Sequence, residues 1–313
     1  LKNDSNLLPL KTSGQKIALI GALANDKTSP LGSWRIGADD NTAISVLEGL
    51  QKYPNNQLMY AKGADVAVGR TQFMWETNIN TTDKSGFAEA IETAKKADVV
   101  VLVLGLNQRL EGEEMPIQVD GFKGGDRTHL NLPKTQEKLM EAINATGKPV
   151  VLVLLNGSAL SVNYAAENMD AILSAGYPGQ EGGNAVADVL FGDYNPAGRL
   201  PVTYYKSVDQ LPAFENYDME GRTYRYFRQS PLYPFGFGLS YTNFTYTDLN
   251  LPKEVKIGEN ITVSVKVTNS GERDGDEVVQ LYLTDEKAST PRPIRSLEGF
   301  KRISLKKGES QIV

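Results

Sequence analysis

The chain has 313 residues, of which 40% are hydrophobic and 23% charged, as in an ordinary globular protein of about two domains. Its net charge of -5 comes with no block of lysine and arginine, and no apolar run approaches the roughly 20 residues that cross a bilayer, so neither nucleic acid nor a membrane is an expected partner. The absence of cysteine excludes disulfides and thiol chemistry, and a single histidine, His129, argues against a metal site or a Ser-His-Asp triad.

The first two thirds of the chain predict alternating strands and helices. Almost continuous apolar runs rich in β-branched residues are typical of parallel strands covered on both faces. Amphipathic stretches between them predict crossover helices. The strands are predicted at residues 17–20, 99–104, 150–155 and 171–173, and the helices at 87–97, 134–145 and 183–190. We therefore expect an α/β sandwich with a mostly parallel sheet over residues 16–205.

The last third of the chain has a different character. Residues 206–243 are rich in turns, prolines and aromatics and predict an irregular strap. Alternating apolar and polar residues then predict strands at 244–249, 260–267 and 277–283. Residues 244–313 are therefore expected to form an all-β sandwich. Since only about four or five strands fit there, against roughly seven in a complete immunoglobulin-like unit, we expect a partial domain within a longer protein.

The most unusual stretch is the long loop 105–133, which begins at the carboxyl end of the predicted strand 99–104. Ligands bind at that edge of parallel sheets. The loop places Glu111, Glu113 and Glu114 close together and continues to Asp126 and Arg127. Because adjacent carboxylates repel one another, we expect at least one of the glutamates to have a raised pKa and to hold a proton near neutrality.

A protonated carboxylic acid is what cleavage of a glycosidic bond requires, since the leaving sugar oxygen must receive a proton. A second carboxylate then attacks the anomeric carbon or activates water. From spacing alone, two of the three glutamates can form such a pair. The alternative is that the string LEGEE, residues 110–114, is a solvated acidic loop without a catalytic role.

Several long strings of this sequence resemble glycoside hydrolase family 3. LEGEE followed by GGDRTHLNLPKTQ resembles the acid/base loop of the family, SAGYPGQEGGNAVADVLFGDYNPAGRLPVTYY and LYPFGFGLSYTNF resemble its α/β sandwich domain, and VTNSGERDGDEVVQLYL resembles its fibronectin type III-like domain. The opening LKNDSNLLPL resembles the exit from an N-terminal (β/α)8 barrel. Long motifs in the right order are more specific than one short motif. The resemblance implies that residues 1–15 are a linker leaving a barrel that this sequence lacks.

The resemblance also implies which residues act. In the family the nucleophile is a barrel aspartate, and the acid/base is a glutamate in a Glu-Gly-x-Asp-Arg pattern on a loop of the sandwich domain. Matching LEGEE to that pattern implies Glu113 as the acid/base. Glu111 and then Glu114 are the alternatives, because an insertion separates the glutamates from Asp126. Asp126 and Arg127 resemble a pair that supports the loop through a bidentate contact.

Three further residues have competing interpretations. Trp34 resembles a family position at the substrate entrance, where its ring would stack on a sugar, and a core or interface tryptophan is the alternative. Arg109 is assigned to a substrate hydroxyl, with an ordinary surface arginine as the alternative. Ser158 follows the strand 150–155, and its pattern favours a helix N-cap.

The resemblance implies part of an exo-acting retaining β-glycosidase that acts on terminal β-D-glucosyl or β-D-xylosyl residues, with β-glucosidase slightly favoured. It implies no cofactor and no metal, a β-linked glycoside as ligand, the missing barrel as partner, and a periplasmic or secreted location. Without the barrel nucleophile the chain alone is expected to be inactive. The alternative is a non-catalytic module that binds carbohydrate or another chain.

Overall fold

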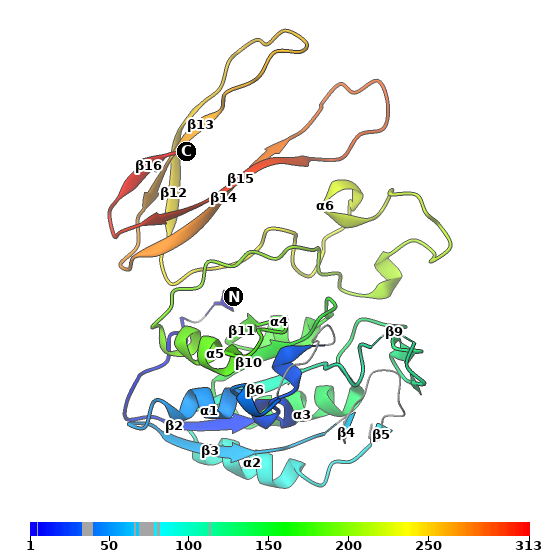
Figure 1. Ribbon diagram of the computed structural model, residues 1–313, viewed down its shortest axis with the longest axis vertical. Helices are drawn as coiled ribbons and strands as arrows, with labels where there is room; N and C mark the ends of the chain where they lie inside the picture. Colours follow the sequence, from blue (N-terminus) through cyan, green and yellow to red (C-terminus); the bar gives the residue numbers. More distant parts are fainter. Residues whose placement is uncertain (5, 33–39, 66, 69–77, 80–81, 113) are drawn as a thin grey trace.

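The computed structural model describes residues 1–4, 6–32, 40–65, 67–68, 78–79, 82–112 and 114–313. Figure 1 shows an α/β domain at one end, an all-β domain at the other, and a long irregular strap that runs between them. The predicted fold class, an α/β sandwich with a mostly parallel sheet followed by a smaller β domain, is confirmed.

A six-stranded sheet forms the centre of the α/β domain. Across the sheet the strands are β1 (Lys2–Asn3), β11 (Ala171–Ser174), β10 (Val150–Leu155), β6 (Val99–Gly105), β2 (Lys16–Ile20) and β3 (Gln57–Ala61). β1 pairs antiparallel with β11, and the other neighbours are parallel. The edge strands β1 and β3 are not among the predicted ones, because β1 has two residues and β3 lacks a fully buried apolar run.

Helices cover both faces of this sheet, as the continuous apolar strands predict. Successive residues of β2 point to opposite layers: Ile17 and Leu19 join one buried cluster, and Ala18 and Ile20 join the other. One face is covered by α2 (Phe87–Lys96), α3 (Lys134–Asn144) and α4 (Asn163–Asn168), and the opposite face by α1 (Val46–Gln51) and α5 (Gly182–Phe191). The predicted helices appear as α2, α3 and α5, whereas α1 and α4 are too short for their periodicity to stand out.

The first residues of the chain also belong to this domain. The segment expected as a linker, residues 1–15, contributes β1 to the sheet, and Leu8 and Leu10 are buried in the cluster beneath α1 and α5. Its path beside the sheet is visible in Figure 1.

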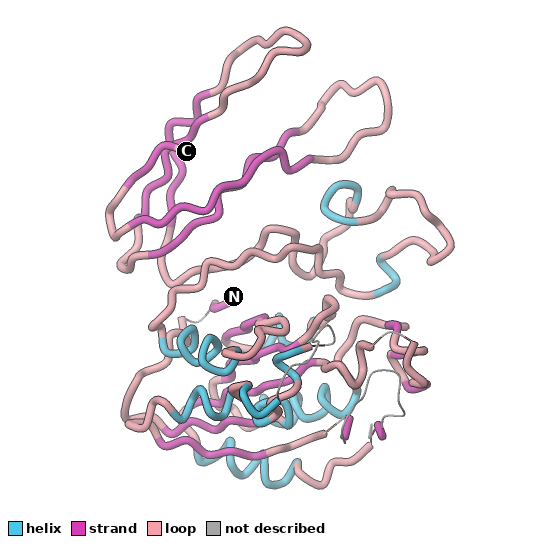
Figure 2. Tube along the Cα trace, in the orientation of Figure 1, coloured by secondary structure: helices cyan, strands magenta, loops and turns pink. Residues whose placement is uncertain are grey.

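The β domain consists of two small sheets. One has β12 (Phe244–Asn250), β13 (Ser264–Asn269) and β16 (Ser310–Ile312), and the other has β14 (Gly275–Leu283) and β15 (Ser296–Leu305). Long loops extend from both sheets (Figure 2). The strand predicted to begin at residue 260 begins only at Ser264. Between the sheets lies a small core of Val267, Val279, Ile303 and Leu305.

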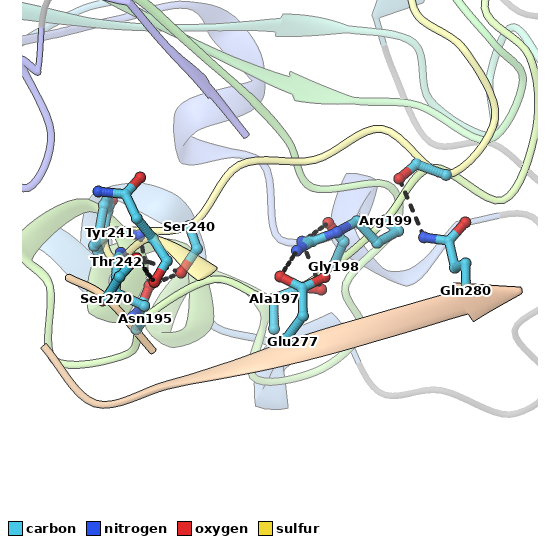
Figure 3. Close-up of polar contacts among 12 residues, drawn as sticks. Asn195, Ala197, Gly198, Arg199, Ser240, Tyr241, Thr242, Ser270, Glu277 and Gln280 are labelled. Atoms are coloured by element: carbon cyan, nitrogen blue, oxygen red, sulfur yellow. Dashed lines mark hydrogen bonds and ion pairs between the residues drawn. The ribbon is translucent and has the colours of Figure 1, made fainter. Parts of the chain in front are cut away.

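Polar contacts fasten residues 195–199, which lie just before the strap, to the β domain (Figure 3). Arg199 forms an ion pair with Glu277 on β14. The Asn195 amide donates to the carbonyl of Asp274, and its oxygen accepts from the hydroxyl of Ser240. Arg199 and Asn195 thus join the end of the α/β segment to the β domain, and Asn195 also joins it to the strap.

Short elements complete the described chain. They are η1 (Ala22–Asn25), η2 (Ser29–Leu31), η3 (Asp40–Thr42), η4 (Val208–Gln210), α6 (Thr223–Tyr226), the pair β4 (Ala67–Val68) and β5 (Asn78–Ile79), and the three-stranded β7 (Gln118–Val119), β8 (Phe122–Lys123) and β9 (Asp126–Arg127). Among the helices that the structure describes, none has both the length and the apolar character needed to span a bilayer.

Candidate active site

The loops that follow the parallel strands meet at one edge of the sheet. This is the edge where open α/β folds bind ligands. The loop after β2 contacts the loop after β6 through Asp26 and Arg109. The loop after β6 in turn contacts the loops after β10 and β11 through Glu111. The predicted acid/base loop is therefore held by its neighbours on both sides.

Both oxygens of Glu111 accept hydrogen bonds from the neighbouring loops. One oxygen, Oε2, accepts from the backbone N–H of Gly157 at 2.8 Å and from the Tyr177 hydroxyl. The other, Oε1, accepts from the backbone N–H of Ser158 at 2.8 Å and from the Ser158 hydroxyl. All four partners are donors, so both carboxylate oxygens act as acceptors of two hydrogen bonds each.

Burial, with the neighbouring negative charge of Glu111 as a further cause, raises the pKa of Tyr177 far above its usual value. The phenol therefore keeps its proton at neutral pH and remains a donor to Glu111. Gly32, in the loop after β2, lies so close to the Tyr177 ring that a Cβ at this position would come within 2.7 Å of it. The ring thus has little room to move away.

Arg127 supports the other end of the loop. Its guanidinium donates to the Ser158 hydroxyl at 3.0 Å and to the carbonyl of Asn131 at 2.7 Å, and it lies over the ring of Phe122 at 4.9 Å. Burial lowers the pKa of Arg127, and the charge of Glu111 acts in the opposite direction. Asp126 is exposed. The described residues Asp126 and Arg127 do not form the predicted ion pair with each other. They are neighbours in β9, so their side chains point to opposite faces of the strand.

The insertion between the glutamates and Asp126 forms β7 and β8, which β9 completes as a small three-stranded sheet. Met115, Ile117 and Phe122 turn inward and join the main core. The backbone N–H of Met115 donates to the carbonyl of Gly124 at 3.1 Å. Gly125 has a φ of +91°, and a Cβ there would come within 1.7 Å of the carbonyl oxygen of Gly112. Only glycine permits this approach, which closes the base of the insertion.

Of the remaining glutamates of the string, the structure describes Glu114, which lies in a turn just before the insertion. Glu114 is exposed and has a φ of +52°, in the left-handed region. Glu113, the predicted acid/base, lies outside the residues that the structure describes, and so does Trp34. The structure thus separates one firmly bound carboxylate, Glu111, from an exposed one, Glu114.

Arg109 does not have the solvated side chain of a surface arginine. Its guanidinium donates to Asp26 at 2.8 Å, and the two side chains are only 13% and 17% exposed. Burial alone would raise the pKa of Asp26, but hydrogen bonds from Ser29 and Thr28 and the charge of Arg109 outweigh it and hold this pKa below its usual value. Through these contacts, Arg109 joins the loop after β6 to the loop after β2.

The sequence did not indicate the roles of Ser158, Tyr177 and Asp26. The N-cap predicted for Ser158 is wrong, because α4 begins only at Asn163 with Val162 as its N-cap. Ser158 instead contacts both Glu111 and Arg127. The signal available in the sequence was its position just after a glycine at the end of a parallel strand, where consecutive N–H groups can bind a carboxylate.

Comparison with known families matches both domains. Residues 1–241 match the glycosyl hydrolase family 3 C-terminal domain, and residues 277–313 match a fibronectin type III-like domain.

Individual relatives match over the whole chain. A protein named periplasmic beta-glucosidase from Salmonella typhimurium is 42% identical over 336 residues, covering 100% of this chain and 42% of the relative. A beta-xylosidase from Formosa agariphila is 43% identical over 326 residues, with coverage of 100% and 42%. A solved β-glucosidase from Erythrobacter marinus has a TM-score of 0.84 at 38% identity, over 100% of this chain and 43% of that one. The chain thus spans about two fifths of the length of these proteins.

Proposed function

This chain belongs to glycoside hydrolase family 3, and from that premise we propose that it supplies the general acid/base of an exo-acting retaining β-glycosidase. The substrates are glycosides with a terminal β-D-glucosyl or β-D-xylosyl residue. An aspartate of an N-terminal barrel in the longer protein is the nucleophile, and no cofactor takes part. In support, the chain covers 42% of relatives named beta-glucosidase and beta-xylosidase.

The acid/base is Glu113, and the observation that carries this choice is the environment of Glu111. Both oxygens of Glu111 accept hydrogen bonds from donors of the neighbouring loops. A proton on this carboxylate would have to displace a donor, so Glu111 is poorly suited to exchange protons with a substrate. The role then falls to one of the two remaining glutamates, and the family pattern selects Glu113 over the exposed Glu114.

The reaction has two proton transfers through the same residue. First, the barrel aspartate attacks the anomeric carbon while Glu113 gives its proton to the glycosidic oxygen, so the aglycone leaves as an alcohol and a glycosyl ester forms. Second, the Glu113 carboxylate takes a proton from water as the water oxygen attacks the anomeric carbon. The sugar is released with its configuration retained, and both carboxyl groups return to their starting states.

The test is Glu113→Ala in the complete enzyme, with activated and unactivated substrates. The variant should lose about 10²–10⁴-fold in kcat/KM on a disaccharide, whose leaving group needs the proton. A dinitrophenyl glycoside, whose leaving group does not, should lose much less. Added azide should restore turnover of the activated substrate and yield a β-glycosyl azide, because a small anion needs no general base.

Glu114→Ala is the matched control and should keep both activities. If Glu114→Ala shows the leaving-group dependence and azide product instead, the assignment moves to that residue. Equal losses on both substrates for Glu113→Ala would contradict an acid/base role altogether.

Sugar preference is tested on the same enzyme with paired aryl β-D-glucoside and aryl β-D-xyloside. We propose β-D-glucosides as the better substrates, and a higher kcat/KM on the xyloside would contradict this. The pocket for the terminal sugar is assigned mainly to the barrel, so exchanging residues 1–313 for those of a relative should leave the preference unchanged.

The 313-residue chain by itself is proposed to be inactive, because general-acid assistance alone contributes only about 10²–10⁴-fold. Purified chain should show no turnover of either aryl glycoside. Robust hydrolysis that is lost in Glu113→Ala would contradict the need for a barrel nucleophile.

We also propose a periplasmic or secreted location for the complete enzyme, in line with the relative named periplasmic beta-glucosidase. Cell fractionation with an antibody against this chain tests it. Recovery with cytoplasmic markers would contradict it.

A further inference from the structure

The two ends of the acid/base loop are bound to one side chain. The Ser158 hydroxyl donates to Glu111, and it accepts from Arg127 at 3.0 Å. A serine hydroxyl can donate one hydrogen bond, and here the Glu111 carboxylate accepts it. The Arg127 guanidinium donates to a lone pair of the same oxygen. The hydrogen-bond directions are therefore fixed. Glu111 and Arg127, on the two sides of the insertion, both contact this one hydroxyl.

Glu111 is held by more than this hydroxyl. Two consecutive backbone N–H groups, of Gly157 and Ser158, each donate at 2.8 Å, and Tyr177 donates its phenol. These groups come from the loops after β10 and β11. We refer to Glu111, Gly157, Ser158 and Tyr177 together as the carboxylate clamp. It joins the loop after β6 to two neighbouring loops.

The clamp is close to the proposed acid/base along the chain. Glu113 follows Glu111 by two positions in the sequence. Gly112, which directly follows Glu111, has its carbonyl packed against Gly125. Met115, two residues after Glu113, is buried. The described residues on both sides of Glu113 in the sequence, Gly112 and Met115, are therefore held by packing.

Resting on the function proposed above, we propose that Glu111 is a positioning residue: through Ser158 and Tyr177 it sets the place of the acid/base carboxyl over the sugar site. It does not itself exchange a proton with the substrate. Displacement of a catalytic group by about 1 Å can cost about 10²-fold in rate. The role is thus distinguishable from simple support of the fold.

The experiment compares Glu111→Gln, Ser158→Ala and Tyr177→Phe in the complete enzyme. Each should lower kcat/KM on the unactivated disaccharide by about 10–100-fold and that on the dinitrophenyl glycoside by less than about threefold, because only the first needs a well-placed proton. Ser158→Thr, which keeps the hydroxyl, should recover most of the loss. Tyr53→Phe is the matched control: it removes another tyrosine-carboxylate hydrogen bond, to Asp193 at 2.7 Å beside α1, and should leave both rates unchanged.

The pH dependence of kcat/KM distinguishes the effect of the Glu111 charge from the effect of its hydrogen bonds. Glu111→Gln removes a negative charge near the acid, so the alkaline limb of kcat/KM should move to lower pH, whereas Ser158→Ala should move it little.

The outcomes distinguish the two proposals. If Glu113→Ala shows leaving-group dependence but all three clamp variants have wild-type ratios, the positioning role is overturned while the function stands. Equal losses on both substrates in the clamp variants would also overturn it, since they would indicate a purely structural role. If Glu113→Ala itself lacks the dependence, the proposed function fails first. Should Glu111→Gln not fold, Ser158→Ala and Tyr177→Phe still decide.

Discussion

Arg199, shortly before the strap, donates a hydrogen bond of 2.8 Å to Glu277 of β14, and both side chains are almost buried, with exposures of 12% and 10%. Arg199 also donates to the carbonyl of Ala197 at 3.0 Å. On the other side, burial and then the charge and hydrogen bond of Glu277 raise the pKa of Tyr246 to about 12. The pair thus links the end of the α/β segment, at Arg199, to both sheets of the β domain.

Arg199→Ala should therefore destabilise the protein strongly. Removing one partner of a buried ion pair leaves the other charge uncompensated, at a cost of about 3–5 kcal/mol. Urea unfolding at neutral pH, followed by circular dichroism, measures this loss. Arg228→Ala is the control, because the pair of Arg228 and Glu220 is 69% and 65% exposed and such pairs contribute about 0–1 kcal/mol. Equal effects of the two variants would contradict the prediction.

Asp26→Asn should lower stability in a pH-dependent way. The pKa of Asp26 is lower in the folded protein than in the unfolded chain, so its contribution is complete above about pH 4 and is lost as the pH falls through the folded-state pKa. At pH 7 we expect a loss of about 1–3 kcal/mol, since Arg109 then lacks its charged acceptor.

Urea unfolding of wild type and Asp26→Asn at pH 7 and at pH values below 4 measures this difference, which should narrow on acidification. Asp209→Asn, at an exposed carboxylate bonded to Ser207, should differ from wild type by less than about 0.5 kcal/mol throughout. A difference for Asp26→Asn that is constant with pH would contradict the assignment.

Gly183→Ala tests the contact between α1 and α5. A Cβ at Gly183 would lie 2.0 Å from the carbonyl oxygen of Ser45. Alanine favours a helix by up to about 1 kcal/mol over glycine, but backbone atoms cannot turn aside as a side chain can, so we expect a net loss of about 1–3 kcal/mol. Thermal unfolding measures it. Gly299→Ala is the control and should be nearly neutral, because nothing lies within 4 Å of the added Cβ. A similar loss of stability in that variant would contradict the steric explanation.

Asn195→Ala should loosen the strap. The Asn195 side chain donates to Asp274 at 2.9 Å and accepts from Ser240 and from the N–H of Tyr241 at 2.8 and 2.7 Å. Without it, limited proteolysis should cut residues 206–243 faster and release the α/β domain. Asn168→Ala, at an exposed amide of α4 bonded to Tyr164, should retain the wild-type cleavage rate. If both variants are cut like wild type, Asn195 does not hold the strap.

Much of the fold was predictable from local sequence, because a strand that is buried on both faces has an almost continuous run of apolar residues. β6 and β10 are apolar at almost every position, and every residue of both strands is buried. The amphipathic pattern predicted α2 and α3 to within one residue at their ends. The edge strand β3, exposed or half-buried over most of its length, has no such run.

The sequence by itself determined the family, the order of the two domains and the loop that carries the candidate acids, since these depend on long strings and on periodicity. Tertiary structure alone decided which glutamate is bound by other loops. The partners of Glu111 lie 46 to 66 residues away in the chain, and those of Arg109 lie 81 and 83 residues away. No local pattern encodes such hydrogen bonds, because folding of the whole sheet brings the loop ends together.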